Sequence, residues 1–285
     1  MRTFEKIADL RRYLAEMRAG GKRIGFVPTM GFLHKGHMAL MRAVKEDPEV
    51  DLSVVSIFVN PLQFGPQEDY RSYPRDLGRD EELCISAGMD VLFIPAVEEM
   101  YPEGFATSVE VTGVTEVLCG RSRPGHFKGV ATVVTKLFNI VQPDCAYFGI
   151  KDAQQFVVIK RMVRDLNLPV KIKAHPTVRE EDGLAVSSRN VYLTKDERRA
   201  ATVLYRSLEC TAAEIRKGER DALRLKRMLT EKISAEPLAR LDYAEVLSWP
   251  DLRPVDVLRR GEVLAAVAAY FGRARLIDNV LVEVE

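Results

Sequence analysis

Apolar residues follow two alternating patterns over about the first 177 positions of the chain. Short continuous apolar runs predict strands buried on both faces, at 24–27, 54–59, 91–94, 146–148 and 170–174. Between these runs, apolar residues recur every three or four positions, as in Ile7, Leu10, Leu14 and Met17, which is typical of helices with one buried face. Strands alternating with helices predict a parallel sheet.

Local signals place the helix boundaries. Gly20-Gly21 is expected to end the first helix, and Pro143-Asp144 the helix whose apolar stripe runs from 130 to 141. Asp152 and Gln155 have the spacing of a capping box that opens the next helix. Further helices are expected up to about Glu46 and near 76–88. The first part is therefore predicted to be a Rossmann-like, doubly wound α/β domain, whose ligands bind at the carboxyl ends of its strands.

The pattern changes after about Ser188. Thr194 and Glu197 form a second predicted capping box, opening a helix through about Lys217, and another helix is expected over 220–233. Strand patterns at 241–247, 263–271 and 275–284 predict a small antiparallel sheet. We expect two domains, residues 1–185 and a smaller C-terminal α+β domain of residues 186–285.

Composition and charge exclude several classes of protein. The 285 residues are 47% hydrophobic, enough for a sizeable core, and 42 basic residues balance 41 acidic ones. No overall field would attract nucleic acid or an anionic membrane. No apolar window approaches the about 18 residues of a membrane span, and the first residues predict an amphipathic helix rather than a secretion signal. We expect a cytoplasmic protein with small-molecule partners, binding neither nucleic acid nor membrane.

The four cysteines are predicted to be ordinary buried or half-buried thiols. Cys84, Cys119, Cys145 and Cys210 are far apart and form no C-x-x-C pair. This spacing supports neither a zinc knuckle nor a disulfide framework.

The segment PTMGFLHKGH, residues 28–37, lies between a predicted strand and helix. Gly31 and Gly36 suit a chain reversal close to a ligand, and the helix start offers unpaired N–H groups to an anion. His34 and His37 would add donors, so a nucleotide phosphate is the favoured ligand. A metal ion would need further ligands, and packing is the remaining alternative. The pattern is neither the Walker A nor the G-x-G-x-x-G sequence.

Three other segments carry candidate chemistry. GRSRPGHFKG, residues 120–129, gathers Arg121, Arg123, His126 and Lys128 before a predicted helix, and is either a solvated basic loop or an anion site at a strand-to-helix junction. Lys151 is expected at the end of a strand, where an ammonium can meet phosphate. Ser187, Ser188 and Arg189 suit triphosphate oxygens.

Six ordered blocks, PTMGFLHKGH, FVNPLQF, YPRDL, GRSRPGHFKGVATVV, YFGIKDAQQ and VSSRNVYL, resemble the pantothenate synthetase family. The first block is similar to the H-x-G-H signature of the nucleotidylyltransferase superfamily. The resemblance implies an ATP-dependent ligase that adenylates pantoate, releases pyrophosphate, and passes the pantoyl group to β-alanine with release of AMP. It also implies a homodimer, and we expect residues 186–285 to act as a lid.

The resemblance implies roles for individual residues. His37, His34 and Lys151 would be catalytic, and Gln63 and Gln155 would hold pantoate, with Gln63 also at the β-alanine site. Mg²⁺ would be held largely by phosphates, with Asp80 the best match for a protein ligand; Arg79 stands where some relatives have an acid. The ATP-binding residues would be Met30, Gly31, Phe32, Leu33, His34, Lys35, Gly36, His37, Gly149, Ile150, Lys151, Asp152, Val178, Val186, Ser187, Ser188 and Arg189.

Two other functions remain open. A nucleotidylyltransferase acting on a phosphorylated acceptor would share H-x-G-H, but would leave Gln63, Gln155 and the basic segment 120–129 without a role. A non-catalytic nucleotide-binding or metal-binding regulator would bind ATP without turnover, or would bind zinc stoichiometrically.

Overall fold

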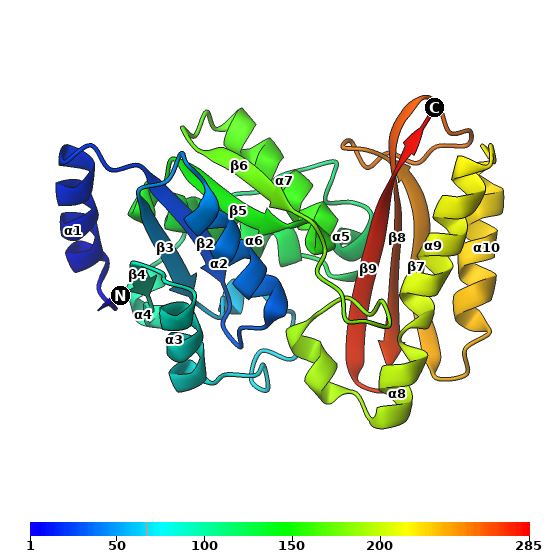
Figure 1. Ribbon diagram of the computed structural model, residues 1–285, viewed down its shortest axis with the longest axis horizontal. Coiled ribbons are helices and arrows are strands. Elements are labelled where there is room, and N and C mark those ends of the chain that lie inside the picture. Colours follow the sequence, from blue (N-terminus) through cyan, green and yellow to red (C-terminus); the bar gives the residue numbers. More distant parts are fainter. Residues whose placement is uncertain (67) are drawn as a thin grey trace. The chain divides into compact units, whose positions relative to one another are not determined.

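The computed structural model describes residues 1–66 and 68–285, and the chain divides into two compact units (Figure 1). Gln67, in the long loop after the second predicted strand, lies outside the described residues. Unit 1 comprises residues 1–112, 123–150 and 158–176, and unit 2 comprises residues 113–122, 151–157 and 177–285. Each unit has its own sheet. The predicted division into 1–185 and 186–285 stays a prediction.

Unit 1 is built on a six-stranded sheet in which every neighbouring pair is parallel, with the order β1-β4-β3-β2-β5-β6. The strand order reverses between β2 and β5, so this is the doubly wound sheet that the sequence predicted. Its strands are β1 (Arg2–Phe4), β2 (Ile24–Thr29), β3 (Leu52–Ile57), β4 (Val91–Phe93), β5 (Cys145–Gly149) and β6 (Lys171–His175).

Helices cover both faces of this sheet. On one face, Met41 of α2 and Cys84 of α3 share a buried core with Val55 of β3. On the other, Phe138 of α6 packs edge-on against Phe26 of β2 and Phe148 of β5. The helices of this unit are α1 (Ile7–Ala19), α2 (Lys35–Glu46), η1 (Pro61–Gln63), α3 (Leu77–Ser86), α4 (Val97–Met100) and α6 (His126–Val141). α7 (Ala153–Asp165), preceded by η2 (Ile150–Asp152), is shared between the units.

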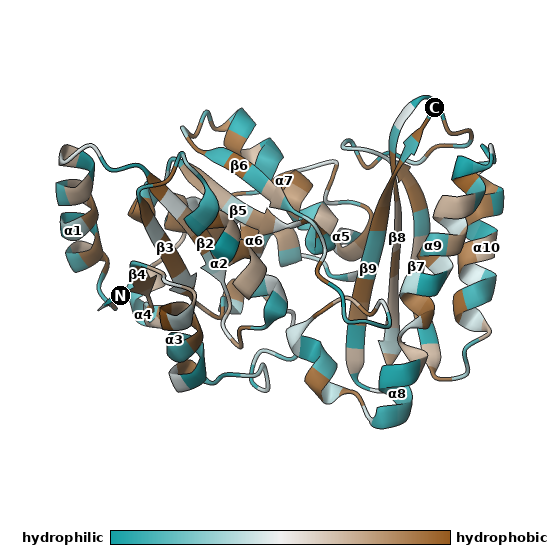
Figure 2. Ribbon diagram, viewed as in Figure 1, coloured by the Kyte–Doolittle hydropathy of each residue, from teal (hydrophilic) through white to brown (hydrophobic). Residues whose placement is uncertain are grey.

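Unit 2 contains an antiparallel sheet in the order β7-β8-β9, as predicted. Strand β8 is almost wholly apolar and buried, whereas α8 is largely hydrophilic (Figure 2). Helices α9 and α10 pack on the sheet, so the core lies between sheet and helices. The elements are α5 (Leu118–Ser122), η3 (Ser188–Tyr192), α8 (Lys195–Ala200), α9 (Val203–Arg216), α10 (Ala222–Ser234), β7 (Ala239–Ser248), β8 (Gly261–Phe271) and β9 (Ala274–Val284).

Several local predictions were wrong. The Thr194–Glu197 capping box forms, but the expected helix through Lys217 is two helices, α8 and α9. The segment 120–129 does not follow a strand; it begins in α5 and ends in α6. Cys210 is exposed, while the other three cysteines are buried. A strand was predicted at 54–59, but β3 spans Leu52–Ile57. The apolar run continues for two residues past the end of the strand.

Candidate active site

The H-x-G-H loop lies at the switch point of the six-stranded sheet. Strand β2 ends at Thr29, and α2 begins at Lys35, so residues 30–34 form the loop at its carboxyl end. Neighbouring β5 ends at Gly149, which puts Gly149 and Ile150 at the same edge. Doubly wound sheets bind ligands at this position, because the chain leaves the two neighbouring strands in opposite directions and a crevice lies between the two following loops.

Asp80 of α3 holds this loop in shape. Gly31 and Phe32 both have left-handed backbone conformations, with φ of 78° and 48°, and the second is unusual for a residue with a side chain. The Asp80 carboxylate accepts the N–H of Phe32 at 2.6 Å and that of Leu33 at 2.7 Å. Asp80 is only 1% exposed, and this burial raises the pKa of its carboxyl despite both N–H donors. Both carboxylate oxygens are therefore engaged by the loop.

His34 and His37 together cap the start of α2. Nδ1 of His34 accepts the N–H of Gly36 at 3.2 Å, and Nδ1 of His37 accepts the N–H of His34 at 3.3 Å. The rings stack with centroids 4.0 Å apart. A backbone N–H only donates, so each Nδ1 presents its lone pair, and the proton of each neutral ring lies on Nε2. The local fold thus selects one tautomer for both imidazoles.

Gln63 reaches the loop from η1. Its side chain is buried, and Nε2 lies 2.8 Å from Sδ of Met30, the first loop residue. The η1 turn packs closely on α6: a Cβ added at Gly129 would lie 2.2 Å from the carbonyl oxygen of Leu62. Only glycine fits at position 129, and the close contact between η1 and α6 brings Gln63 to the loop.

The basic segment 120–129 divides between the units. Arg123 and His126 both contact the carbonyl oxygen of Gln63, at 3.3 and 2.8 Å. Arg123 also forms two 2.6 Å hydrogen bonds with Glu68; burial alone would raise the pKa of Glu68, but Arg123 lowers it. Arg121 lies instead in unit 2 and pairs with Glu245 at 3.2 Å. Part of the predicted anion site therefore supports the Gln63 turn.

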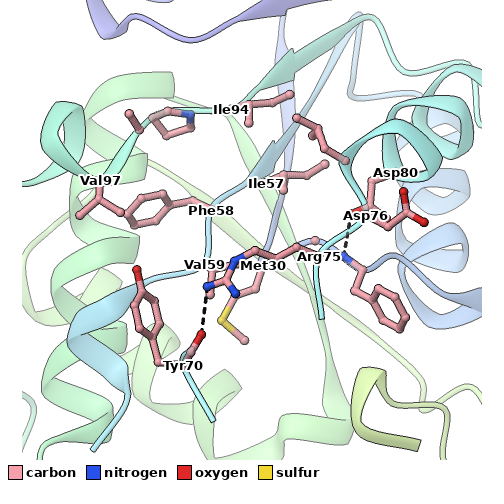
Figure 3. Close-up of a pocket in the computed structure, with 15 residues that line it drawn as sticks. Met30, Ile57, Phe58, Val59, Tyr70, Arg75, Asp76, Asp80, Ile94 and Val97 are labelled. Carbon is pink, nitrogen blue, oxygen red and sulfur yellow. Dashed lines mark hydrogen bonds between the residues drawn. The ribbon is translucent and has the colours of Figure 1, made fainter. Parts of the chain in front are cut away.

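A cavity of about 260 Å³ lies beside the loop, at the carboxyl ends of β2, β3 and β4 (Figure 3). Most of its walls are apolar, and the Arg75 side chain crosses it, donating to the carbonyl oxygens of Tyr70 and Tyr73. Its lining includes Met30, Ile57, Phe58, Ile94 and Val97. The lining also includes the carboxylates of Asp76 and Asp80, so the cavity is an apolar space with a few charged groups, as is common in small-molecule sites.

Unit 2 holds the remaining predicted residues. The amide of Asn279 on β9 donates to the carbonyl oxygen of Lys151 at 2.8 Å, fixing the turn that carries this lysine. Asp152 follows in η2, and Gln155 lies in the first turn of α7.

The segment 178–189 folds back on itself. Val186 donates its N–H to the carbonyl oxygen of Val178, and Ser187 caps η3 by accepting the N–H of Arg189. Ser188 is buried at the start of η3. Nearby, Arg179 and buried Asp278 form a two-point ion pair at 2.6 and 2.9 Å.

A parallel sheet with an H-x-G-H loop at its switch point and imidazoles at a helix start defines the nucleotidylyltransferase type of fold. A sequence profile described as Pantoate-beta-alanine ligase matches residues 2–281. The chain belongs to the pantoate-β-alanine ligase family.

Individual relatives resemble the chain over its whole length. It is 58% identical to the pantothenate synthetase of Carboxydothermus hydrogenoformans, covering 100% of both chains. The crystal structure of pantothenate synthetase from Thermus thermophilus matches with a TM-score of 0.92 and 50% identity, over 98% of this chain and 99% of that one. A Francisella tularensis pantoate-β-alanine ligase, complexed with β-γ ATP and β-alanine, matches at 0.79 and 35% identity over 99% and 97%.

None of the helices formed by residues 1–66 and 68–285 is long and apolar enough to cross a membrane.

Proposed function

We propose that this protein ligates pantoate and β-alanine, using ATP and forming a pantoyl adenylate. The observation that carries the proposal is family membership over residues 2–281, together with the H-x-G-H loop at the switch point of the sheet. The Francisella tularensis relative, crystallised with β-γ ATP and β-alanine, supports ATP and β-alanine as substrates.

The chemistry proceeds in two substitutions. A carboxylate oxygen of pantoate attacks the α-phosphorus of ATP, the bond to the bridging oxygen breaks, and pyrophosphate leaves with its electron pair. The neutral amine of β-alanine then attacks the acyl carbon. The C–O bond to AMP breaks, the nitrogen loses a proton, and the products are pantothenate and AMP. Activation is needed because a carboxylate is a poor electrophile, whereas AMP is a good leaving group.

His34 and His37 are proposed to stabilise the charge that develops on the phosphates. Their Nε2 protons suit hydrogen bonds to phosphate oxygens, and the neighbouring N–H groups and dipole of α2 favour an anion at the same place. Protonation at Nδ1 would break the cap bonds to Gly36 and His34. We therefore propose that His37 stabilises the phosphate charge as a neutral hydrogen-bond donor, rather than transferring a proton from a ring that is protonated on both nitrogens.

The remaining roles are proposed by residue. Lys151 would meet phosphate as a cation, and Gln63 and Gln155 would bind pantoate, with Gln63 beside β-alanine. The other proposed ATP contacts are Met30, Gly31, Phe32, Leu33, Lys35, Gly36, Gly149, Ile150, Asp152, Val178, Val186, Ser187, Ser188 and Arg189.

Within the part of the chain that the structure describes, the side chain expected to hold Mg²⁺ does not fit that role. Among residues 1–66 and 68–285, no three His, Cys, Asp or Glu side chains gather as a metal site. Asp80, the expected ligand, directs both oxygens to backbone N–H groups. Any Mg²⁺ bound with ATP would therefore be held by the phosphates.

A homodimer and a cytoplasmic location remain part of the proposal, on family resemblance and sequence pattern alone. Light scattering would test the dimer.

The sharpest test of the activity is exchange of labelled pyrophosphate into ATP. Exchange should require pantoate and should not require β-alanine, because adenylation precedes amide formation. Exchange independent of pantoate would exclude the proposed reaction. Mass analysis of the products distinguishes AMP from an adenylyl group transferred to a phosphorylated acceptor, and tight ATP binding without turnover would indicate a regulator.

A further inference from the structure

Asn60 is a buried side chain whose hydrogen-bonding capacity is fully used. It is 1% exposed and precedes η1. Its Oδ1 lies 3.3 Å from the N–H of Leu62 and 2.8 Å from the Tyr101 hydroxyl, and its Nδ2 lies 3.1 Å from both the Gly129 carbonyl oxygen and Oε1 of Gln63. Two acceptor sites and two N–H groups thus meet four partners.

Two backbone partners determine which end of the Asn60 amide is which. The N–H of Leu62 can only donate, so the atom facing it is the oxygen, and the carbonyl of Gly129 can only accept, so the atom facing it is the nitrogen. It follows that the Tyr101 hydroxyl donates to Asn60.

The same logic orients Gln63. Because Asn60 donates through Nδ2, the group that it meets on Gln63 must be the carbonyl oxygen, and the Gln63 NH₂ group points the other way, towards Sδ of Met30. A thioether is a weak acceptor. Gln63 therefore presents N–H donors beside the nucleotide loop, which suits carboxylate and hydroxyl oxygens and not an ammonium group.

We propose that Tyr101 is a positioning residue that, through Asn60, fixes the Gln63 amide with its N–H groups towards pantoate. Tyr101 follows α4, and its ring is held by Phe58 and Phe105, with centroids 5.9 and 5.0 Å away. Burial raises the pKa of the Tyr101 hydroxyl, so this hydroxyl stays a proton donor throughout the neutral range. The proposal rests on the role assigned to Gln63 under the proposed function.

The test is Tyr101→Phe, which removes the hydroxyl and keeps the ring packing. The KM for pantoate should rise about 5- to 10-fold, the effect of weakening one neutral hydrogen bond, while the KM for ATP changes less than about twofold. In a Gln63→Ala background, Tyr101→Phe should raise the pantoate KM no further, because the two residues act in one chain. Tyr147→Phe is the matched control: it also removes a hydroxyl donor, which bonds Asp47, and should leave the pantoate KM unchanged.

The outcomes separate this inference from the proposed function. Wild-type protein that forms no pantothenate overturns the function. Active wild type with an unchanged pantoate KM in Tyr101→Phe overturns the positioning role. Equal increases in the KM values for ATP and pantoate, or an undiminished effect in the Gln63→Ala background, also overturn it, because they indicate a general structural role.

Discussion

At the residue scale, His34 and His37 serve both the helix and the proposed chemistry. Each Nδ1 accepts a backbone N–H at the start of α2, which leaves the Nε2 proton as the donor for a ligand. A residue of another type could cap the helix or donate to phosphate, but imidazole does both from opposite sides of one ring. The cap therefore supplies the orientation that a preorganised donor needs.

Replacing His37 with Ala should lower the rate of pyrophosphate exchange by about 10²- to 10³-fold, as expected for one preorganised donor in adenylyl transfer. Circular dichroism should show an unchanged fold, since Ala is well tolerated inside a helix. His175 at the end of β6, which contacts the carbonyl oxygen of Pro176, provides the control His175→Ala. Full exchange activity in folded His37→Ala would exclude a catalytic role.

Sequence patterns indicated some residues of the candidate site and missed others for a physical reason. His34 and His37 are conspicuous in the sequence because two of the four histidines in the chain lie in one glycine-containing loop. Asn60, Tyr101 and Asn279 act by bonding to residues distant in sequence, and Tyr101 is 41 positions from Asn60. Only folding brings such partners together, although Asn60 before Pro61 is itself a turn signal.

At the element scale, α3 contributes to the site through a single buried carboxylate. Asp80 lies one turn into α3 and pairs with the two N–H groups of the left-handed loop segment, so the helix fixes the loop that precedes α2. The family resemblance implied that Asp80, in the acidic segment after YPR, is a protein ligand of Mg²⁺. Its hydrogen bonds instead indicate an anchor.

Asp80→Asn should loosen the nucleotide loop, because the new NH₂ group must face a backbone N–H and leave one donor unpaired. We expect a rise of about 10-fold in the KM for ATP, a lower Tm, and unchanged dependence on Mg²⁺ concentration; an unpaired buried donor costs about 1–3 kcal/mol. Asp221→Asn is the matched control, since exposed Asp221 caps α10 by accepting the N–H of Arg224 and Asn caps equally well.

Steady-state kinetics at varied ATP and Mg²⁺ provide the measurement. A higher Mg²⁺ requirement in Asp80→Asn, with the KM for ATP unchanged at saturating Mg²⁺, would identify Asp80 as a metal ligand after all and would contradict its role as an anchor.

Element types were predictable where periodicity is long and regular, as in α6 and the three strands of unit 2. Short β1 was missed, because Arg2–Phe4 carries no alternating pattern and pairs only with three-residue β4. The interruption between α8 and α9 was also missed, because Ala201 and Thr202 are compatible with a continuous helix and form a turn here. Such breaks depend on packing within unit 2 and not on local preference.

At the scale of the whole molecule, each unit has a hydrophobic core of its own, and charged groups connect elements within unit 1. In unit 1, Asp47 at the end of α2 accepts hydrogen bonds from Tyr147 of β5 and Lys173 of β6. Lys173 also pairs with Glu49 at 2.8 Å. Three elements that are distant in sequence thus meet at one carboxylate.

The Asp47 network makes unit 1 sensitive to acid. Burial alone would raise the pKa of Asp47, but hydrogen bonds from Lys173, Tyr147 and the backbone of Glu49 lower it from 3.8 to about 2. The unfolded chain therefore binds more protons than the folded chain between these values. The stabilisation is complete above about pH 4 and is lost as pH falls towards 2.

Asp47→Asn should lower Tm at pH 7, and the difference in Tm from wild type should narrow as pH falls from 4 towards 2. The amide of the variant does not titrate, so the variant lacks this stabilisation at every pH. The wild type loses the same stabilisation as pH falls through this window, so the two Tm values approach each other. Calorimetry at pH 7, 4 and 3 measures both effects, with Asp9→Asn as the control because Asp9 is exposed and makes only a 3.5 Å surface pair with Arg12. A difference that stays constant at all three pH values would mean that Asp47 stabilises by packing and not by charge.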